Sequence, residues 1–139
     1  MILGGGLAGS YPARVDSAQL VRDTWDALSR GDLTPLENAL APDAKWRAVQ
    51  DGPWNCESRA AILDVMRHNL AQGLSGRIED VLPVADRVVV AFRPDNHQPG
   101  AWPLDNGVRY LVLTVAQGRI TEMKGCADRQ TALSYAGTS

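Results

Sequence analysis

The stretch GVRYLVLTVAQGRITEMKGC (residues 107–126) contains two β-rich runs separated by the turn signal Gln117-Gly118. Short runs rich in Val, Leu and Ile and bounded by turn residues are typical of strands. A second stretch, GRIEDVLPVADRVVVAFRP (residues 76–94), repeats this pattern around Ala85-Asp86. These connections are too short for crossovers, so the four predicted strands should form a mostly antiparallel sheet.

The first half of the chain is predicted to be mainly helical. Residues 16–31 begin with a capping box, in which Asp16 stands three residues before Gln19, and end at Gly31. Two more helices are predicted over 34–41, with Thr34 as cap, and over 58–73, from Ser58. A strand is predicted over 44–50, and residues 128–137 are expected to form a short helix or a turn. Helices that come early and strands that come late indicate an α+β fold rather than a doubly wound sheet.

Length and composition limit the class of protein. A chain of 139 residues suggests one domain, and its formal net charge of −2 with no Lys/Arg block argues against nucleic-acid binding. No apolar run is long enough to span a bilayer. The two cysteines do not make a disulfide framework, and their spacing gives no metal site. We therefore expect a cytoplasmic protein with no metal, and we expect residues 1–14 to be a flexible N-terminal extension.

Three phrases of the sequence resemble the nuclear transport factor 2-like superfamily and, within it, the SnoaL-like proteins. They are VRDTWDALSRGDLTPLENALAPDAKW (21–46), ESRAAILDVMR (57–67) and GRITEMKGCADRQTAL (118–133). The resemblance implies that residues 15–139 are a single SnoaL-like domain with an α+β, cone-shaped nuclear transport factor 2-like fold. In such a fold a curved, mixed and mostly antiparallel sheet packs on three N-terminal helices around a pocket. The resemblance also implies homodimers through the outer face of the sheet.

The ketosteroid isomerase-like mechanism of this superfamily does not carry over. That mechanism needs a carboxylate that acts as the base. It also needs a tyrosine and a protonated acid that hold the oxyanion. The resemblance places Thr24 at the tyrosine position, Ala48 near the base position, and Tyr110 or Leu111 near the acid position. None of the three positions has the required residue.

Two other family mechanisms have partial candidates. Limonene epoxide hydrolase-like members use an Asp-Arg-Asp set, for which Arg109 is the candidate arginine, but Leu111 stands where an aspartate is needed. SnoaL-like cyclases use an acidic residue in an apolar pocket. Asp128 and Glu122 are the candidates for that role.

Aromatic and apolar side chains are the predicted ligand contacts. Trp46 and Trp54 are either pocket walls or ordinary core residues. Cys56 is expected to fill a small gap as a buried hydrophobe, because no base or electropositive setting marks it as a nucleophile. Trp102 lies in an irregular stretch where it is either a lid or a dimer contact. The full predicted set is Thr24, Trp46, Trp54, Cys56, Met66, Asn69 and Trp102.

The predicted catalytic groups are Tyr110, Asp128 and His97. Arg109 and Tyr110 are neighbours on a strand, so they face opposite sides of the sheet. We expect Tyr110 on the pocket side, with a place on the outer sheet surface as the alternative. Asp128 either exchanges protons or caps the C-terminal helix. His97 lies in the irregular stretch, where it could transfer a proton.

These residues predict a protein that binds a small apolar or aromatic molecule. The predicted chemistry is cofactor-independent acid/base isomerisation, cyclisation or hydration. The alternative is a non-catalytic module for ligand binding or dimerisation. An enzyme should hold a carboxyl or imidazole group with a perturbed pKa inside the pocket, whereas a carrier should have an apolar pocket whose few polar groups are satisfied by protein partners.

Overall fold

The computed structural model describes residues 13–48, 55–72, 76–95 and 107–137, with side chains from residue 17 onward. Most of the predicted N-terminal extension, together with Trp54, His97 and Trp102, lies outside these residues. The elements are α1 (Ala13–Ser29), α2 (Thr34–Ala39), β2 (Leu40–Arg47), α3 (Arg59–Ala71), β3 (Gly76–Val84), β4 (Arg87–Pro94), β5 (Arg109–Ala116), β6 (Arg119–Cys126) and α4 (Arg129–Ala136). No helix among them is long and apolar enough to cross a membrane.

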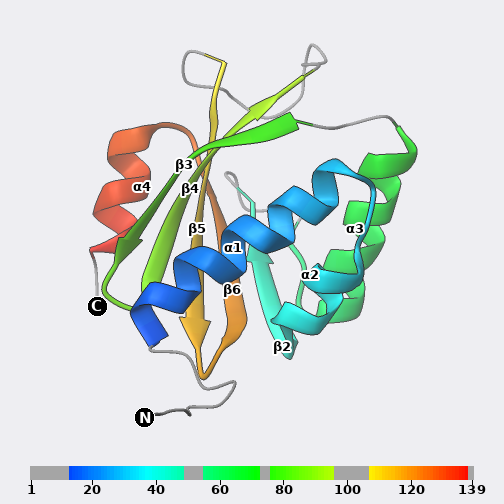
Figure 1. Cartoon of the computed structure of the whole chain (residues 1–139), viewed down its shortest axis with the longest axis horizontal. Coiled ribbons are helices and arrows are strands. Elements are labelled where there is room, and N and C mark those ends of the chain that lie inside the picture. Colours follow the sequence, from blue (N-terminus) through cyan, green and yellow to red (C-terminus); the bar gives the residue numbers. More distant parts are fainter. Residues whose placement is uncertain (1–12, 49–54, 73–75, 96–106, 138–139) are drawn as a thin grey trace, which may run out of the picture.

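The strands form one five-stranded mixed sheet in the order β2-β6-β5-β4-β3 (Figure 1). Strands β3, β4, β5 and β6 each pair antiparallel with the next strand in the sequence, so they form a meander. This is the antiparallel arrangement that the sequence predicted. β2 joins the other side of β6 in parallel, with Trp46 opposite Met123. This α+β arrangement confirms the predicted fold class.

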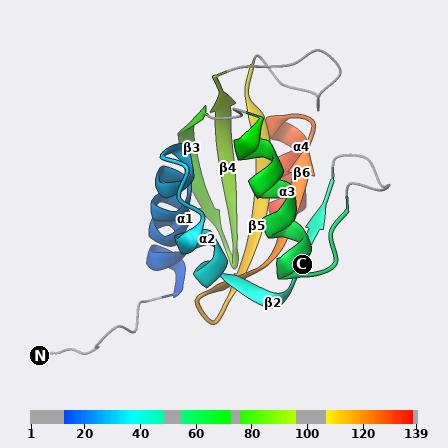
Figure 2. The same cartoon turned by 90° about the vertical axis from the view of Figure 1, so that its right-hand side faces the viewer.

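Helices cover both faces of the sheet. We call the face toward α1, α2 and α3 the inner face and the face toward α4 the outer face. Helix α1 contacts β3 and β4, α3 contacts β2, and α4 contacts β4, β5 and β6. Figure 2 shows α1 and α3 on either side of α2, with the sheet behind them. The outer face that a predicted homodimer would use is therefore partly occupied by α4.

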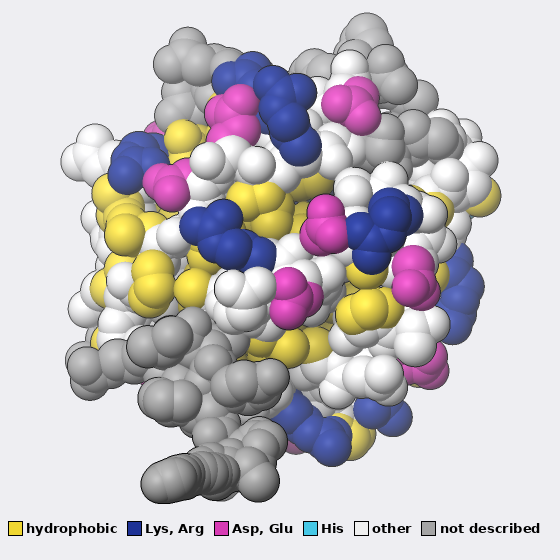
Figure 3. Space-filling view, in the orientation of Figure 1, with side chains coloured by type: hydrophobic (Ala, Val, Ile, Leu, Met, Phe, Trp, Pro, Cys, Tyr) yellow, Lys and Arg dark blue, Asp and Glu magenta, His cyan; other side chains and the backbone are white. Residues whose placement is uncertain are grey.

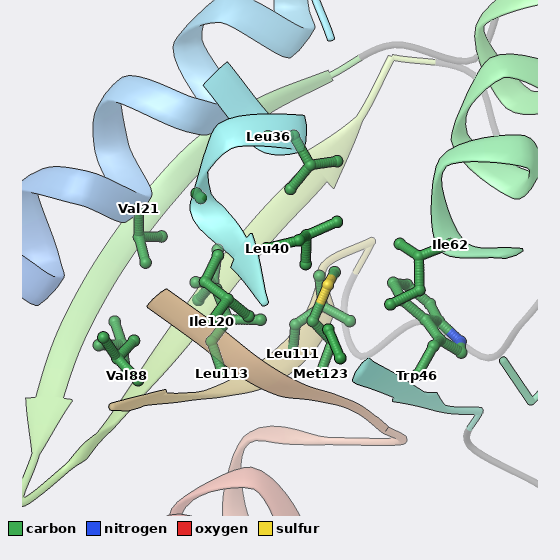
Figure 4. Packing of buried hydrophobic residues seen from close by; sticks show 14 of the residues in the cluster. Val21, Leu36, Leu40, Trp46, Ile62, Val88, Leu111, Leu113, Ile120 and Met123 are labelled. Atoms are coloured by element: carbon green, nitrogen blue, oxygen red, sulfur yellow. The ribbon is translucent and has the colours of Figure 1, made fainter. Parts of the chain in front are cut away.

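Alternating side chains on the strands divide between the two faces. The inner residues of β4, β5 and β6 include Val88, Leu113 and Met123, none of which is exposed to solvent. They pack with Leu36 and Leu40, which come from α2 and the start of β2 (Figure 4). The outer residues form a separate cluster with α4, composed of Val89, Ala91, Val108, Tyr110, Val112, Cys126, Ala132 and Ala136.

The ends of the helices confirm some predicted signals and correct others. Helix α1 begins at Ala13, so Asp16 lies inside the helix and is not its first cap. Its C-terminal end matches the prediction, because Gly31 takes a positive φ of 79° and its N–H donates to the carbonyl of Leu28 at 2.9 Å. For α2 the predicted cap is wrong: the N-cap position is Leu33, not Thr34.

Helix α3 begins as predicted. Ser58 is its N-cap, and the hydroxyl of Ser58 accepts a hydrogen bond from the backbone N–H of Ala61 at 3.2 Å. The two hairpin turns also lie where they were expected. Ala85 and Gln117 each take a φ of 54°, and Gly118 follows with 76°, as in the tight turns that suit the twist of antiparallel strands.

The inner layer predicts where truncation is most destabilising. Leu113→Ala removes a fully buried side chain from the middle of β5, so we expect urea unfolding to show a loss of about 2–5 kcal/mol. Leu82→Ala, which truncates a half-buried residue at the edge of the outer cluster, is the matched control and should cost less. Equal losses in both variants would contradict a core centred on the inner face.

Candidate functional site

An arginine and a tryptophan meet on the inner face of the sheet. Arg109 begins β5 and lies on the same side of the strand as Leu111 and Leu113, which belong to the inner cluster. Its guanidinium carbon lies over the ring of Trp46, 5.5 Å from the ring centroid. Trp46 comes from β2 and is only 3% exposed. The Arg109–Trp46 pair therefore joins two strands that are not neighbours in the sheet.

The register of the strands explains how these two side chains meet. β6 lies between β2 and β5, and its inner residue between the levels of Trp46 and Arg109 is Gly125, which pairs with Leu111. Glycine has no side chain, so β6 presents none between Trp46 and Arg109 at this level.

The surroundings of Arg109 are mainly apolar on the sheet. Phe92 of β4 stands directly opposite Arg109, and Ile78 of β3 stands opposite Phe92. Both are half-buried hydrophobic residues that pack against the inner cluster. Burial lowers the pKa of Arg109 to about 9, because a desolvated site disfavours the charged form. The guanidinium is still protonated at neutral pH, so the inner face carries a positive charge.

Backbone hydrogen bonds join Trp46 to Cys56. The backbones of Trp46 and Cys56 exchange two hydrogen bonds, each 2.9 Å long, and form an isolated antiparallel bridge. The side-chain oxygen of Asn55 accepts a third bond from the N–H of Ala48 at 2.8 Å. Cys56 is buried, and burial raises the pKa of its thiol. The prediction that Cys56 is a small buried hydrophobe agrees with this placement.

The other predicted contacts lie on the helices that cover the inner face. The hydroxyl of Thr24 donates to the carbonyl of Leu20 at 2.7 Å within α1, so this buried group is already satisfied. Met66 is half-buried and packs against the inner cluster from α3. Asn69 is half-buried on the same helix, one turn further along.

Tyr110 lies on the outer face, which corrects the expectation that it points toward the pocket. It is 8% exposed and belongs to the outer cluster with Cys126 of β6 and Ala132 of α4. The physical reason is the alternation of the strand, which places Tyr110 with Val112 and leaves Arg109 with Leu111. Tyr110 therefore packs beneath α4 and lies on the opposite face from Trp46.

Glu122 also faces outward. Its carboxylate accepts a hydrogen bond from the hydroxyl of Tyr135 on α4. Arg87 of β4 completes the contact, since its guanidinium lies over the Tyr135 ring at 4.9 Å from the centroid and donates to the backbone carbonyl of Tyr135 at 2.7 Å. Burial and the bond to Glu122 raise the pKa of Tyr135 to about 12. The three side chains fasten α4 to the sheet.

Asp128 caps α4, as one of its two predicted roles requires. Its side chain accepts a hydrogen bond from the backbone N–H of Thr131 at 2.7 Å. This bond holds the pKa of Asp128 below its usual value, because a hydrogen bond to the charged carboxylate favours that form. The cap lies on the side of the sheet away from Trp46.

The described carboxylates do not enter the inner face. Every Asp and Glu whose side chain is described is exposed, apart from Glu122 and Asp128, and both of these serve α4. His68 is exposed on α3. Within the same residues no group of His, Cys, Asp and Glu side chains could hold a metal ion. Arg109 is the charged side chain that the described residues place on the inner face.

The chain belongs to the SnoaL-like domain family, whose model matches residues 21–123. The nuclear transport factor 2-like superfamily suggested by the sequence is thereby confirmed. No curated protein sequence matches the chain.

Solved structures share the fold at low sequence identity. A protein from Sinorhizobium meliloti provisionally assigned as a polyketide cyclase is 21% identical, with a TM-score of 0.65, over 83% of this chain and 99% of that one. An LEH-like epoxide hydrolase from M. tuberculosis is 18% identical, with a TM-score of 0.65, over 88% and 90% of the two chains. TerC, co-crystallized with polyporic acid, is 16% identical, with a TM-score of 0.62, over 87% and 97%. These likenesses establish the fold.

Sequence reasoning missed which of two neighbours faces inward. It weighed Arg109 and Tyr110 and preferred the tyrosine, because a phenol suits an apolar wall. Both faces of β5 pack in hydrophobic clusters. The run LVL (111–113) is therefore apolar on both sides, and its alternation does not show which side faces inward. The signal that could have decided is the C-terminal helix, whose Ala132 and Ala136 lie one turn apart and need an apolar face to pack on.

The role of Asp128 as a cap predicts a pH-dependent contribution to stability. Because the pKa of Asp128 is lowered on folding, its contribution is present above the pKa of the unfolded chain and is lost as the pH falls through the folded value. We expect Asp128→Ala to lower the melting temperature at pH 7 and the difference to shrink in acid. Asp128→Asn, which caps helices without titrating, should stay close to wild type at pH 7. A melting temperature unchanged by Asp128→Ala would contradict the cap.

Tyr135 should ionise late. A spectrophotometric titration of tyrosinate, compared between wild type and Tyr135→Phe, should assign a pKa of about 12 to Tyr135. Since this pKa is raised on folding, the stabilising contribution is complete below the ordinary tyrosine value of about 10 and is lost as the pH rises toward the folded value. Ionisation of Tyr135 near pH 10 in the folded protein would show that its hydroxyl is not held by Glu122.

Proposed function

We propose that the inner face around Arg109 and Trp46 binds a small apolar or aromatic molecule in a pocket of the cone. The observation that carries the proposal is the Arg109–Trp46 pair itself. The inner face combines the aromatic ring of Trp46, the planar cation of Arg109 and hydrophobic neighbours such as Phe92. Ligand sites are typically apolar with a small number of placed polar groups.

Membership of the SnoaL-like family and the likeness in fold to a provisionally assigned polyketide cyclase and an epoxide hydrolase support this proposal. TerC, which shares the fold, was co-crystallized with a small molecule, polyporic acid. Each of these proteins is under 25% identical to the chain. The residues of the inner face therefore carry the argument.

Two versions of this function differ in whether chemistry follows binding. Cofactor-independent isomerisation, cyclisation or hydration needs a group that gives and takes a proton near neutral pH. Asp128 and Glu122 lie on the outer side of the sheet, and Tyr110 lies beneath α4. Among the described residues this arrangement favours the alternative, a ligand-binding protein that performs no acid/base chemistry with these groups. His97, outside the described residues, remains the predicted proton carrier of the catalytic version.

The binding proposal is tested by titrating the protein with steroids, phenols of the polyketide type and small terpenoids, with tryptophan fluorescence and calorimetry as readouts. We expect saturable binding of one class. Trp46→Ala should weaken that binding by roughly 10-fold, about 1.4 kcal/mol, because the ring that supports the Arg109 guanidinium is removed. Trp46→Phe keeps an aromatic ring and is the matched control, expected to retain most of the affinity.

Circular dichroism and thermal unfolding of both variants separate a lost contact from a lost fold. A folded wild-type protein that binds none of the three classes would contradict the binding proposal and would favour a module that acts through assembly. Equal affinity of wild type and a folded Trp46→Ala variant would place the ligand elsewhere.

A further inference from the structure

Helices α1 and α4 cover opposite sides of the sheet. Figure 3 shows the side that α1 crosses, where charged side chains of both signs lie with hydrophobic side chains between them. Figure 2 shows α3 in front of the strands and α4 behind them. Because α4 packs on the outer face and takes no part in the strand pairing, its release would leave all five strands of the sheet paired.

The apolar packing of α4 is weaker than that of the inner helices. The buried residues of α4 are Ala132 and Ala136, both with small side chains. Helix α1, by comparison, buries Val21 and Trp25. The larger apolar side chains of α4 remain half-buried. Since hydrophobic stabilisation follows the apolar area removed from water, α4 gains less from packing than α1 does.

The length of α4 links its docking to its helical structure. The helix has eight residues, and isolated helices shorter than about 12–15 residues are marginal in water. Contacts with the sheet are therefore needed to keep these residues helical. When α4 leaves the outer face, its helix should melt in the same step.

Polar contacts at Tyr135 add to this weak apolar packing. The Tyr135 hydroxyl donates to the carboxylate of Glu122. Arg87 lies over the Tyr135 ring and donates to the backbone carbonyl of Tyr135 at 2.7 Å. A further bond, from Nε of Arg87 to the hydroxyl oxygen of Thr114 at 3.2 Å, orients the guanidinium. Hydrogen bonds to charged groups are the stronger ones, so these Tyr135 contacts are a main part of what holds α4.

The two cysteines lie on opposite sides of the sheet. Cys126 is 2% exposed and belongs to the outer cluster with Ala132 and Ala136 of α4. Cys56 is 4% exposed and belongs to the inner cluster. Release of α4 would uncover Cys126 and leave Cys56 buried. The chain therefore carries one thiol that reports on each side.

We propose that α4 is a releasable cover of the outer face, which leaves the sheet as one unit while the strands and the inner cluster stay folded. The Tyr135 contacts set how often it leaves. Local opening of this kind is drawn from elements with few buried apolar contacts. Release uncovers the apolar side chains beneath α4, among them Val89, Tyr110 and Val112. The proposal goes beyond ligand binding on the inner face and does not depend on it.

The test measures the reaction of each thiol with 5,5′-dithiobis(2-nitrobenzoic acid) at pH 8, in the full chain and without denaturant. Cys56→Ala leaves Cys126 as the reporter, and Cys126→Ala leaves Cys56. When α4 closes faster than the reagent reacts, the labelling rate follows the population of the open form. We expect Cys126 to react at least about 10-fold faster than Cys56, a difference of about 1.4 kcal/mol in opening free energy.

Two substitutions on α4 separate the Tyr135 contacts from the helix as a whole. Tyr135→Phe removes the hydroxyl that Glu122 holds and keeps the ring beneath Arg87. It should speed the labelling of Cys126 by roughly 10-fold and leave that of Cys56 nearly unchanged. Gln130→Ala changes an exposed residue of the same helix and is the matched control, expected to leave both rates close to those of the parent.

Hydrogen exchange of wild type supplies an independent measurement. The backbone amides of α4 should exchange with one common opening free energy, below that of the β5 amides. If a variant does not fold, this comparison decides. Equal opening free energies in α4 and β5, or equal labelling of the two cysteines, would overturn the proposal. Labelling of Cys126 that is unchanged in folded Tyr135→Phe would overturn the role given to the Tyr135 contacts.

Discussion

The parallel pairing of β2 with β6 is the constraint on which the rest of this structure depends. The meander from β3 to β6 could form from local hairpins, but β2 comes from the N-terminal half of the chain and must find β6 across a large sequence separation. Its register sets Trp46 opposite Met123. The amine of Lys124 reinforces the join by donating to the carbonyl of Ala48 at 3.1 Å. This pairing fastens α2 and α3, which flank β2 in the chain, to the inner side of the sheet.

The covering of both faces sorts the polar side chains into two environments. On the outer face, Glu122 and Arg87 meet Tyr135 in a set of contacts that serves α4. On the inner face, Arg109 lies among hydrophobic residues with Trp46 beside it. A shift of β5 by one residue would exchange Tyr110 for Arg109 and bury the charge beneath α4. The register of β5 therefore decides both the stability of the outer cluster and the character of the inner wall.

The parts of this fold with local signals were predictable from the sequence, and the parts set by tertiary contacts were not. The hairpins at Ala85 and Gln117, the end of α1 at Gly31 and the cap at Ser58 follow from turn and capping chemistry that acts over a few residues. The facing of Tyr110 depends on α4 and was predicted wrongly, since both sides of β5 are apolar. Asp16 and Thr34 had capping patterns, yet α1 starts before the first and Leu33 takes the cap position before the second.

An arginine on the inner wall favours a different chemistry from the carboxylate that the sequence led us to look for. With a pKa of about 9, Arg109 keeps its proton at neutral pH, so it is a poor general base there and a good partner for negative charge. It can hold an anion in the ground state or stabilise one that develops on a bound molecule, as donors aimed at an oxyanion do. Either use needs water kept away, because the attraction between charges weakens steeply in a high dielectric. Ile78 and Phe92 form a hydrophobic row beside the guanidinium, so the residues that make the charge costly to bury would also strengthen its attraction to an anion.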